Sequence, residues 1–385
     1  MATSTQPLDA SRLSIHLTTT PREVPIPGSK TATGCTDHMI IADWTTEAGW
    51  STPQLVPYGP MEMMPSASVL HYSTSCFEGL KLYRGHDGNL RLFRPEANCA
   101  RFLRSAQRIS LPEFDPEQVQ HLIRKLCEID GPRWLPKIYP GRFLYLRPTM
   151  IGTDSSLGFH APRAARLFII ICCWPTIQSA DDTGMRLVVS TEGSVRAWPG
   201  GTGASKVGAN YGPTVQAHVK ATTAGFQQVL WVFGKDDQVT ESGSSNLFTI
   251  WETTDGRVEI VTCPLENDLV LPGITRQSIL ALLRERLDVE GSALLGSVKP
   301  VTVAERSYTM GEIQAAAREN RLLGAFAAGT AYFVTPVSYI DYRGEGIEVP
   351  VGKVPYVALL QEWLADIMYG KVESDWAEVV EEPTA

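Results

Sequence analysis

The segment Gly200-Gly-Thr-Gly-Ala-Ser-Lys206-Val-Gly-Ala-Asn-Tyr211-Gly is the most unusual stretch of the chain, and its glycines beside a lysine invite comparison with phosphate-binding loops. A P-loop needs Gly-Lys-Ser/Thr in direct succession, whereas the order here is Gly203-Ala-Ser-Lys206. The dinucleotide-binding fingerprint also fails, because its third glycine position is occupied by Lys206. Both nucleotide-binding interpretations are therefore disfavoured.

A different role suits this loop better. Small residues around Lys206 leave room for a bulky planar cofactor to reach its amine, as a Schiff-base lysine requires. Tyr211 follows five residues later and could donate a hydrogen bond to a phenolate oxygen of such a cofactor. The alternative is a surface turn with a solvated lysine, and composition alone does not separate the two.

Three stretches farther along the chain carry similar hints. In Gln238-Val-Thr-Glu241-Ser-Gly-Ser-Ser, a carboxylate on a tight loop between strands could pair with a buried cationic ring nitrogen, although such residues are usually solvated. Leu271-Pro-Gly-Ile274-Thr275 marks a helix start, whose free N–H groups and dipole favour an anion such as phosphate, or is simply a common cap. Ala328-Gly-Thr330 leads into a strand or is an ordinary loop.

Composition removes several classes of function. A length of 385 residues favours two domains or one large one, and 34 basic against 42 acidic residues give a net charge of −8, which offers nucleic acid no general attraction. The longest apolar run, Leu167 to Trp174, is far shorter than the ~20 residues of a membrane helix. The seven histidines show no metal-ligand spacing, so we expect no metal site and no membrane span.

The cysteines and the N-terminus suggest a compartment. Seven cysteines, an odd number without any C-x-x-C, favour reduced thiols in a cytosol-like environment. The N-terminal segment lacks a secretory apolar core, and Asp9 with only Arg12 and Arg22 makes it a poor mitochondrial presequence. We expect a cytoplasmic protein, with the mitochondrion as the alternative.

Hydrophobic patterns predict a mixed α/β protein in two halves. We expect an N-terminal arm over 1–30, a small α/β domain over 31–176, a polar linker over 177–184 and a larger domain over 185–385. Strands are expected near 39–41, 69–72, 80–83, 90–93, 143–147, 167–171, 185–190, 229–233, 247–251, 258–261 and 331–334. Helices are expected near 95–109, 119–126, 212–224, 275–288 and 355–369.

The separate motifs resemble one family when they are taken in order. GASKVGANY, VTESGSSNLF, LPGITRQSIL and GTAYFVTPV look like the fold-type IV pyridoxal-phosphate aminotransferases, specifically the eukaryotic-type branched-chain amino acid aminotransferases. LHYSTSCFEGLKLYRG and YLRPTMIGTDSSLG agree, and the resemblance extends from about residue 12 to 378.

The resemblance implies a fold and a reaction. The fold would be a smaller α/β N-terminal domain and a larger pseudo-barrel C-terminal domain carrying the cofactor lysine, usually in a homodimer whose sites are completed by the neighbouring subunit. The reaction would be ping-pong transamination of leucine, isoleucine and valine with 2-oxoglutarate, using pyridoxal 5'-phosphate. The partners would be small amino acids and 2-oxo acids, without nucleic acid or membrane.

The resemblance also implies residue roles. Lys206 would form the Schiff base and shuttle the proton, and the cofactor would be held by Arg101, Tyr211, Glu241, Ile274, Thr275 and Thr330. The substrate carboxylate would be received by Tyr72, Thr330 and Ala331, and the side-chain pocket would be walled by Phe77 and Tyr145. Arg147 would meet the second carboxylate of glutamate, and Ser244 would lie near the substrate.

Departures from the family pattern leave the substrate range open. Ser242, Ser244 and Ser245 stand where the family usually has Val, Thr and Met. One alternative is another fold-type IV enzyme, such as a D-amino acid or (R)-amine aminotransferase or a lyase; the tyrosine and arginine of YLRPT argue against it. The other is an inactive homologue with a binding role, although every cofactor-contacting position is intact.

Overall fold

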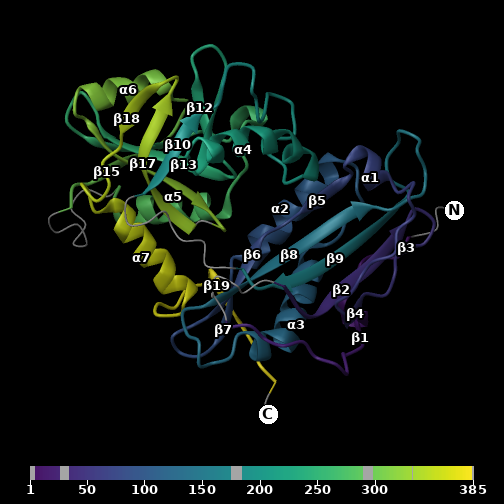
Figure 1. Ribbon diagram of the computed structural model, residues 1–385. Coiled ribbons are helices and arrows are strands. Elements are labelled where there is room, and N and C mark those ends of the chain that lie inside the picture. The colour runs from purple at the N-terminus through teal and green to yellow at the C-terminus, as the bar shows by residue number, and fades with distance from the viewer. Residues whose placement is uncertain (1–4, 27–33, 175–183, 289–297, 332, 384–385) are drawn as a thin grey trace. The chain divides into compact units, whose positions relative to one another are not determined.

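The computed structural model describes residues 5–26, 34–174, 184–288, 298–331 and 333–383, which form two compact units (Figure 1). The first unit comprises Met1–Thr176, Ser205–Ala209 and Ala365–Ala385, and the second comprises Ile177–Ala204 and Asn210–Leu364. The short segment that contains Lys206 therefore groups with the first unit, although the chain on both sides of it belongs to the second. The expected linker, 177–184, lies outside the described residues except for Gly184.

In the first unit, the described residues form a ten-stranded sheet in the order β1-β4-β2-β9-β8-β6-β7-β19, with β3 beside β2 and β5 beside β8. All of these pairs are antiparallel except β1 with β4. The strands are β1 (Ser14–Ile15), β2 (Cys35–Thr45), β3 (Gly49–Trp50), β4 (Gln54–Pro57), β5 (Ser75–Phe77), β6 (Leu80–Arg84), β7 (Leu90–Phe93), β8 (Phe143–Gly152), β9 (Ala164–Cys172) and β19 (Ala377–Val380). The helices of this unit are α1 (Ser68–Tyr72), α2 (Pro95–Arg108), α3 (Pro116–Trp134) and the short 3-10 turn η1 (Ala10–Arg12).

One face of this sheet is packed under α2 and α3. Alternate residues of the strands, such as Leu144 and Leu146 of β8, join one apolar core with Phe102 of α2 and Leu122 of α3. Because strand side chains alternate between faces, the residues between them, including Tyr145, point to the opposite face. The helices thus fix the sheet and leave its other face to carry polar and aromatic side chains.

Several expectations for this unit are confirmed and one is wrong. β6 and β7 pair as the expected hairpin, and α2 and α3 lie where helices were predicted. The expected strand at 69–72 is instead the short helix α1, which ends at Ser73 in the left-handed region (φ 53°). A short apolar run does not distinguish helix from strand, and this one has no neighbouring strand to pair with in the described sheet.

In the second unit, the described residues form a nine-stranded sheet in the order β12-β11-β10-β17-β16-β13-β14-β15, with β18 beside β17. An additional pairing of β12 with β13 closes six of the strands on themselves, which confirms the expected pseudo-barrel. The strands are β10 (Met185–Val189), β11 (Gln228–Phe233), β12 (Gln238–Ser242), β13 (Ser245–Glu252), β14 (Val258–Thr262), β15 (Val301–Glu305), β16 (Leu322–Gly329), β17 (Phe333–Tyr342) and β18 (Glu345–Glu348). The helices are α4 (Val215–Thr223), α5 (Ile274–Arg286) and α6 (Met310–Arg318), and the short 3-10 turns are η3 (Gly212–Thr214) and η4 (Glu266–Asp268). Helix α7 (Tyr356–Met368) begins in the second unit and ends in the first, and the 3-10 turn η2 (Gly208–Asn210) begins in the first unit and ends in the second.

The sequence patterns did not predict β12, β15, β16, β18 and α6 of this unit, of which β16 and α6 are instructive. β16 is rich in alanine, a weak strand former, but it lies between β13 and β17 and pairs with both. The strand expected at 331–334 is the beginning of β17, which starts at Phe333. α6 begins with a reciprocal capping box between Thr309 and Glu312, a signal that could have identified it. None of the helices in the described ranges is both long and apolar enough to span a membrane.

Candidate active site

Lys206 is held by the first unit at its backbone. Its N–H donates to Ser105 Oγ of α2 at 2.9 Å, and its carbonyl oxygen accepts from the N–H of Phe77 in β5 at 3.1 Å. The side-chain amine lies 4.9 Å from the centroid of the Phe77 ring. Both backbone hydrogen-bonding groups of Lys206 are thus fixed, and its amine lies against an aromatic face.

The residues after Lys206 explain why this segment lies close to β5. Val207 is fully buried and forms an isolated bridge with Cys76. At Gly208, a β-carbon would lie 2.3 Å from the Ser75 hydroxyl oxygen, so only glycine permits this approach. The small residues around the lysine allow close backbone contact with the first unit, which the sequence alone did not indicate.

The structure brings three of the expected substrate residues together with Lys206. Tyr145 and Arg147 are two positions apart on β8 and therefore share a face of the sheet. The guanidinium carbon of Arg147 lies 4.7 Å from the centroid of the Phe77 ring and 5.3 Å from that of Tyr145, and its Nη2 donates to the Tyr145 hydroxyl at 3.4 Å. Its Nε is buried without a hydrogen-bond partner among the described residues, so it can receive a ligand oxygen.

Tyr72, the fourth expected substrate residue of this unit, has different neighbours. Its hydroxyl donates to the carbonyl oxygen of Leu157, and its ring meets the edge of Phe159 with centroids 5.9 Å apart. Phe159 is 92% exposed, and Leu70 and Leu157 are exposed as well. Tyr72 thus lies with the exposed apolar residues Leu157 and Phe159 rather than with the group around Phe77.

Arg101, expected to hold phosphate, is paired with a residue that sequence reasoning missed. Its Nε lies 2.7 Å from Glu78 Oε1 and its Nη2 lies 2.8 Å from Oε2, which also accepts from Asn98 Nδ2 at 2.8 Å. Burial by itself raises the pKa of Glu78, but the positive charges of Arg101 and Lys206 lower that pKa below its ordinary value. A charged residue, Glu78, directly after Phe77 in an apolar stretch was the available signal.

Glu241 lies at the seam where the barrel closes. It is on β12, in register with Trp231 of β11 on one side and Asn246 of β13 on the other, whereas the sequence placed it in a loop. The loop is the turn that follows, in which Gly243 has φ 58°. Glu241 Oε1 accepts from Asn246 Nδ2 at 3.1 Å and from the Leu271 N–H at 3.0 Å.

A second charged partner of an expected site residue was also missed. Arg196 Nη2 lies 2.7 Å from Glu241 Oε2, and both side chains are buried. The segment VRAWPGG, which contains Arg196, is part of the resemblance to the family, but nothing in it indicated a partner for the arginine. The ion pair between Arg196 and Glu241 is recognised only from the three-dimensional structure.

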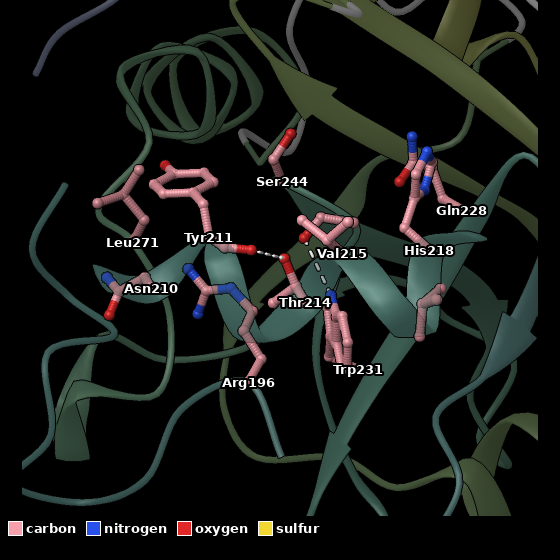
Figure 2. Close-up of a pocket in the computed structure, with 12 residues that line it drawn as sticks. Arg196, Asn210, Tyr211, Thr214, Val215, His218, Gln228, Trp231, Ser244 and Leu271 are labelled. Atoms are coloured by element: carbon pink, nitrogen blue, oxygen red, sulfur yellow. Dashed lines mark hydrogen bonds between the residues drawn. The ribbon is translucent and has the colours of Figure 1, made fainter. Parts of the chain in front are cut away.

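Arg196 also lines a cavity of about 270 Å³ that Figure 2 shows. Tyr211 stands at one side, its carbonyl accepting from Thr214 Oγ at 2.7 Å, and Ser244 lies at the turn after β12. Ser244 is exposed, whereas Ser242 is buried with its Oγ 3.9 Å from Met185 Sδ in the barrel core. Of the serines in this turn, Ser244 is therefore the one that lines the cavity.

The expected anion site at the start of α5 has the anticipated form. The helix begins at Ile274, followed by Thr275, and its N-cap Gly273 makes no side-chain cap. The first N–H groups are thus available to an anion. A β-carbon at Gly273 would lie 2.1 Å from Asn246 Oδ1, which explains the glycine. Thr330 and Ala331 lie in the turn between β16 and β17.

The chemistry of these side chains fits the pyridoxal phosphate that the resemblance implies. A lysine amine is held on a fixed backbone, a buried carboxylate is oriented by two N–H donors, and an uncapped helix start can meet a phosphate. In the described residues, no group of three or more His, Cys, Asp or Glu is placed to hold a metal ion.

Known proteins place this geometry in a family. Residues 75–340 match the family described as amino-transferase class IV. The chain is 42% identical over 373 residues to a mitochondrial branched-chain-amino-acid aminotransferase of Schizosaccharomyces pombe, covering 95% of this chain and 84% of that one. It is 40% identical over 382 residues to the cytosolic branched-chain-amino-acid aminotransferase of Saccharomyces cerevisiae, covering 97% and 98%.

Solved structures agree. The T.th. branched-chain amino acid aminotransferase with pyridoxamine 5'-phosphate superposes with a TM-score of 0.65 at 25% identity, covering 88% of this chain and 98% of that one. The shared architecture is the fold-type IV arrangement of a mixed α/β unit and a barrel. These matches give no support to the D-amino acid or (R)-amine alternative. The chain belongs to the branched-chain-amino-acid aminotransferases, within the class IV aminotransferase family.

Proposed function

We propose that this enzyme transfers the amino group of leucine, isoleucine and valine to 2-oxoglutarate, with pyridoxal 5'-phosphate as cofactor. The products are the branched-chain 2-oxo acids and L-glutamate, formed in a ping-pong reaction. The proposal is supported by the family membership and by the names of relatives about 40% identical over nearly the whole chain.

The observation that carries the proposal is the placement of Lys206. Hydrogen bonds to Ser105 and Phe77 fix the backbone of Lys206, so the position of its Cα is defined. Its amine lies beside the ring of Phe77, an apolar surface that suits the side chain of a branched-chain amino acid. When bound, pyridoxal phosphate supplies an aldehyde for amino-group exchange and a ring that accepts the electrons of the Cα–H bond. Lys206 would hold the cofactor through its amine and would carry the proton that leaves the substrate Cα.

The other cofactor-binding residues would orient the cofactor and stabilise the charges on its ring and its phosphate. Glu241 accepts a hydrogen bond from the ring nitrogen and keeps it protonated, and Tyr211 donates to the phenolate oxygen. Arg101, the N–H groups of Ile274 and Thr275, and Thr330 hold the phosphate. The uncapped start of α5 supports this assignment, because a helix N-terminus favours an anion.

The substrate residues divide by chemistry. Phe77 and Tyr145 offer aromatic walls to a branched side chain, and Arg147 offers a guanidinium to the second carboxylate of glutamate. Tyr72, Thr330 and Ala331 receive the α-carboxylate, and Ser244 lies near the side chain. The buried Nε of Arg147 supports its role, since a buried donor is normally bonded.

We further propose a homodimer and a cytoplasmic location. The exposed apolar cluster of Tyr72, Leu157 and Phe159 supports the dimer, because such clusters mark contact surfaces. Sedimentation or light scattering would show twice the 42.3 kDa chain mass, and a monomer would contradict the proposal. All seven cysteines are free of disulfides, which supports a reducing compartment, testable by cell fractionation.

Borohydride reduction of the loaded enzyme tests the central assignment. The cofactor should become fixed to the peptide that contains Lys206, as mass spectrometry would show, and Lys206→Ala should abolish fixation and lower transamination by orders of magnitude. Burial lowers the pKa of Lys81 to about 8, so Lys81 offers a second amine that is uncharged at moderately alkaline pH, and its peptide is the internal control. Fixation at Lys81, or activity retained by Lys206→Ala, would refute the assignment.

A further inference from the structure

Arg196 contacts three separate segments of the second unit. Its Nη2 lies 2.7 Å from Glu241 Oε2, and the same nitrogen donates to the carbonyl oxygen of Gly203 at 3.5 Å. Its Nη1 donates to the carbonyl oxygen of Leu269 at 3.2 Å. The Nη2 contact with Glu241 is an ion pair between two charged groups, whereas the other two contacts are hydrogen bonds to neutral carbonyl oxygens.

Glu241 is a costly residue for this fold to bury. Only 2% of its side chain is exposed, and an unpaired carboxylate removed from water is strongly disfavoured. Two neutral donors, Asn246 Nδ2 and the Leu271 N–H, orient Oε1 but supply no opposite charge. Arg196, with only 9% of its side chain exposed, supplies that charge at the other oxygen.

We propose that Arg196 is a positioning residue that keeps Glu241 ionised and fixed before any cofactor binds. The inference rests on the proposed function, in which Glu241 meets the ring nitrogen. The arriving nitrogen then finds a carboxylate that is already charged and aimed, so that binding requires no change in its protonation or orientation. The alternative is that Arg196 only joins the loops at Gly203 and Leu269 through their carbonyls.

The surroundings of Glu241 make the two possibilities separable by pH. In the described part of this unit, Arg196 contacts the carboxylate, and Cys263 lies close enough for the two charges to interact. Burial, with a contribution from Glu241, raises the pKa of Cys263 to about 12, so this thiol stays neutral between pH 6 and 8. Arg276 lies next to Cys263 and stays charged over that range. Of Glu241, Cys263 and Arg276, the carboxylate is therefore the group that can change charge if its arginine is removed. His218 lines the same cavity as Arg196, so His218→Gln is carried as a background in every variant to keep the pH comparison specific to the carboxylate.

The test is a double-mutant cycle on the cofactor-free protein, in which the melting temperature of each variant is measured at pH 8 and at pH 6. Arg196→Gln should lower the melting temperature by roughly 5–10 °C at pH 8, because it strands a buried charge. The loss should be smaller at pH 6, where the stranded carboxylate takes up a proton. Adding Glu241→Gln should recover most of the loss, and Arg196→Lys should keep the small pH dependence of the wild type.

A matched cycle uses Arg84 and Glu382, another pair with a buried arginine. Glu382 is near the C-terminal end of the described chain and partly exposed, so Glu382→Gln should not rescue Arg84→Gln. Equal instability of Arg196→Gln with and without Glu241→Gln, or loss of folding in both, would overturn the proposal. Folding of the double variant alone would support it. Because no cofactor is present, either result leaves the borohydride test of Lys206 untouched.

Discussion

Each unit of this enzyme buries an arginine–glutamate pair, and the two pairs are built in opposite ways. In the first unit, Arg101 is the residue expected to meet the ligand, and Glu78 holds it with two oxygens at 2.7 and 2.8 Å. In the second, Glu241 is the expected ligand residue, and Arg196 meets it through one nitrogen at 2.7 Å. In both units, the charged residue that is expected to contact the cofactor already has an oppositely charged partner. That residue is the arginine in the first unit and the glutamate in the second.

The difference lies in where the partners come from. Glu78 follows β5 and Arg101 lies in the second turn of α2, so a strand and a helix of the regular fold position that pair. Arg196 comes from a turn-rich segment, and its other contacts are loop carbonyls. Both pairs should therefore contribute to global stability, and the second should in addition order the loops at the barrel seam.

The largest expected effect is on the first pair. Glu78→Ala should lower the free energy of unfolding by about 3–5 kcal/mol, because it leaves Arg101 buried without its counter-charge. Urea unfolding of the cofactor-free protein at pH 7 measures the loss. Asp255→Ala, which breaks an exposed ion pair with Arg257, is the control and should change stability by less than about 1 kcal/mol.

The pH dependence of the same variant sharpens the comparison. The pKa of Glu78 is lowered in the folded protein, so its ionised form contributes stability above its unfolded pKa of about 4.3, and that contribution is lost as the pH falls through the folded value. The stability difference between wild type and Glu78→Gln should therefore be constant from pH 7 to 5 and shrink only in stronger acid. A difference that shrinks already between pH 7 and 6 would contradict the lowered pKa.

The second pair should matter more for the reaction than for the fold. Glu241→Gln keeps the shape of the side chain but removes the charge that keeps a ring nitrogen protonated, and it should slow turnover by about 100-fold or more. Cofactor content, measured by absorbance, should stay close to wild type. A rate within twofold of wild type would remove Glu241 from the chemistry and leave the second pair purely structural.

Sequence reasoning recovered one member of each pair. Arg101 and Glu241 lie in motifs that resemble a family, but Glu78 and Arg196 were missed, because a counter-ion is recognised by proximity in space. The barrel was expected from the resemblance, whereas β16 was overlooked because its alanines favour helix until two neighbouring strands pair with it. The segment around Lys206 shows the same limit, since nothing in its sequence indicated contact with β5 and α2.

Ser105 links the first pair to Lys206 and should give a smaller effect. Its buried Oγ donates to the Arg101 carbonyl oxygen at 3.0 Å and accepts the Lys206 N–H at 2.9 Å. Ser105→Ala leaves that N–H without its acceptor, which should cost about 1–3 kcal/mol of stability. Borohydride fixation at Lys206 should also slow, because the backbone beneath the amine loosens.

Ser190→Ala is the matched control, since Ser190 Oγ likewise accepts a backbone N–H, from Val232 at 3.2 Å. It should lose comparable stability without slowing fixation. Equal fixation rates in Ser105→Ala and Ser190→Ala would show that Ser105 supports the fold only. The reactivity of Lys206 would then not depend on its link, through Ser105, to the Arg101–Glu78 pair.

The smallest expected effect concerns Ser244, which lies three residues after Glu241 and lines the cavity beside Arg196 and Tyr211. A missing methyl contact changes discrimination by only about 1–3 kcal/mol, so leucine and isoleucine should remain good substrates. The room left by the missing methyl group should nevertheless admit methionine, phenylalanine and a hydroxylated analogue better than a strict branched-chain enzyme would. Ser244→Thr should narrow that range by lowering kcat/KM for the larger donors relative to leucine, whereas Ser242→Thr, at a serine buried against Met185, should instead reduce stability. Strict branched-chain preference in the wild type, unchanged by Ser244→Thr, would show that Ser244, in the turn after the strand that carries Glu241, does not contact the substrate side chain.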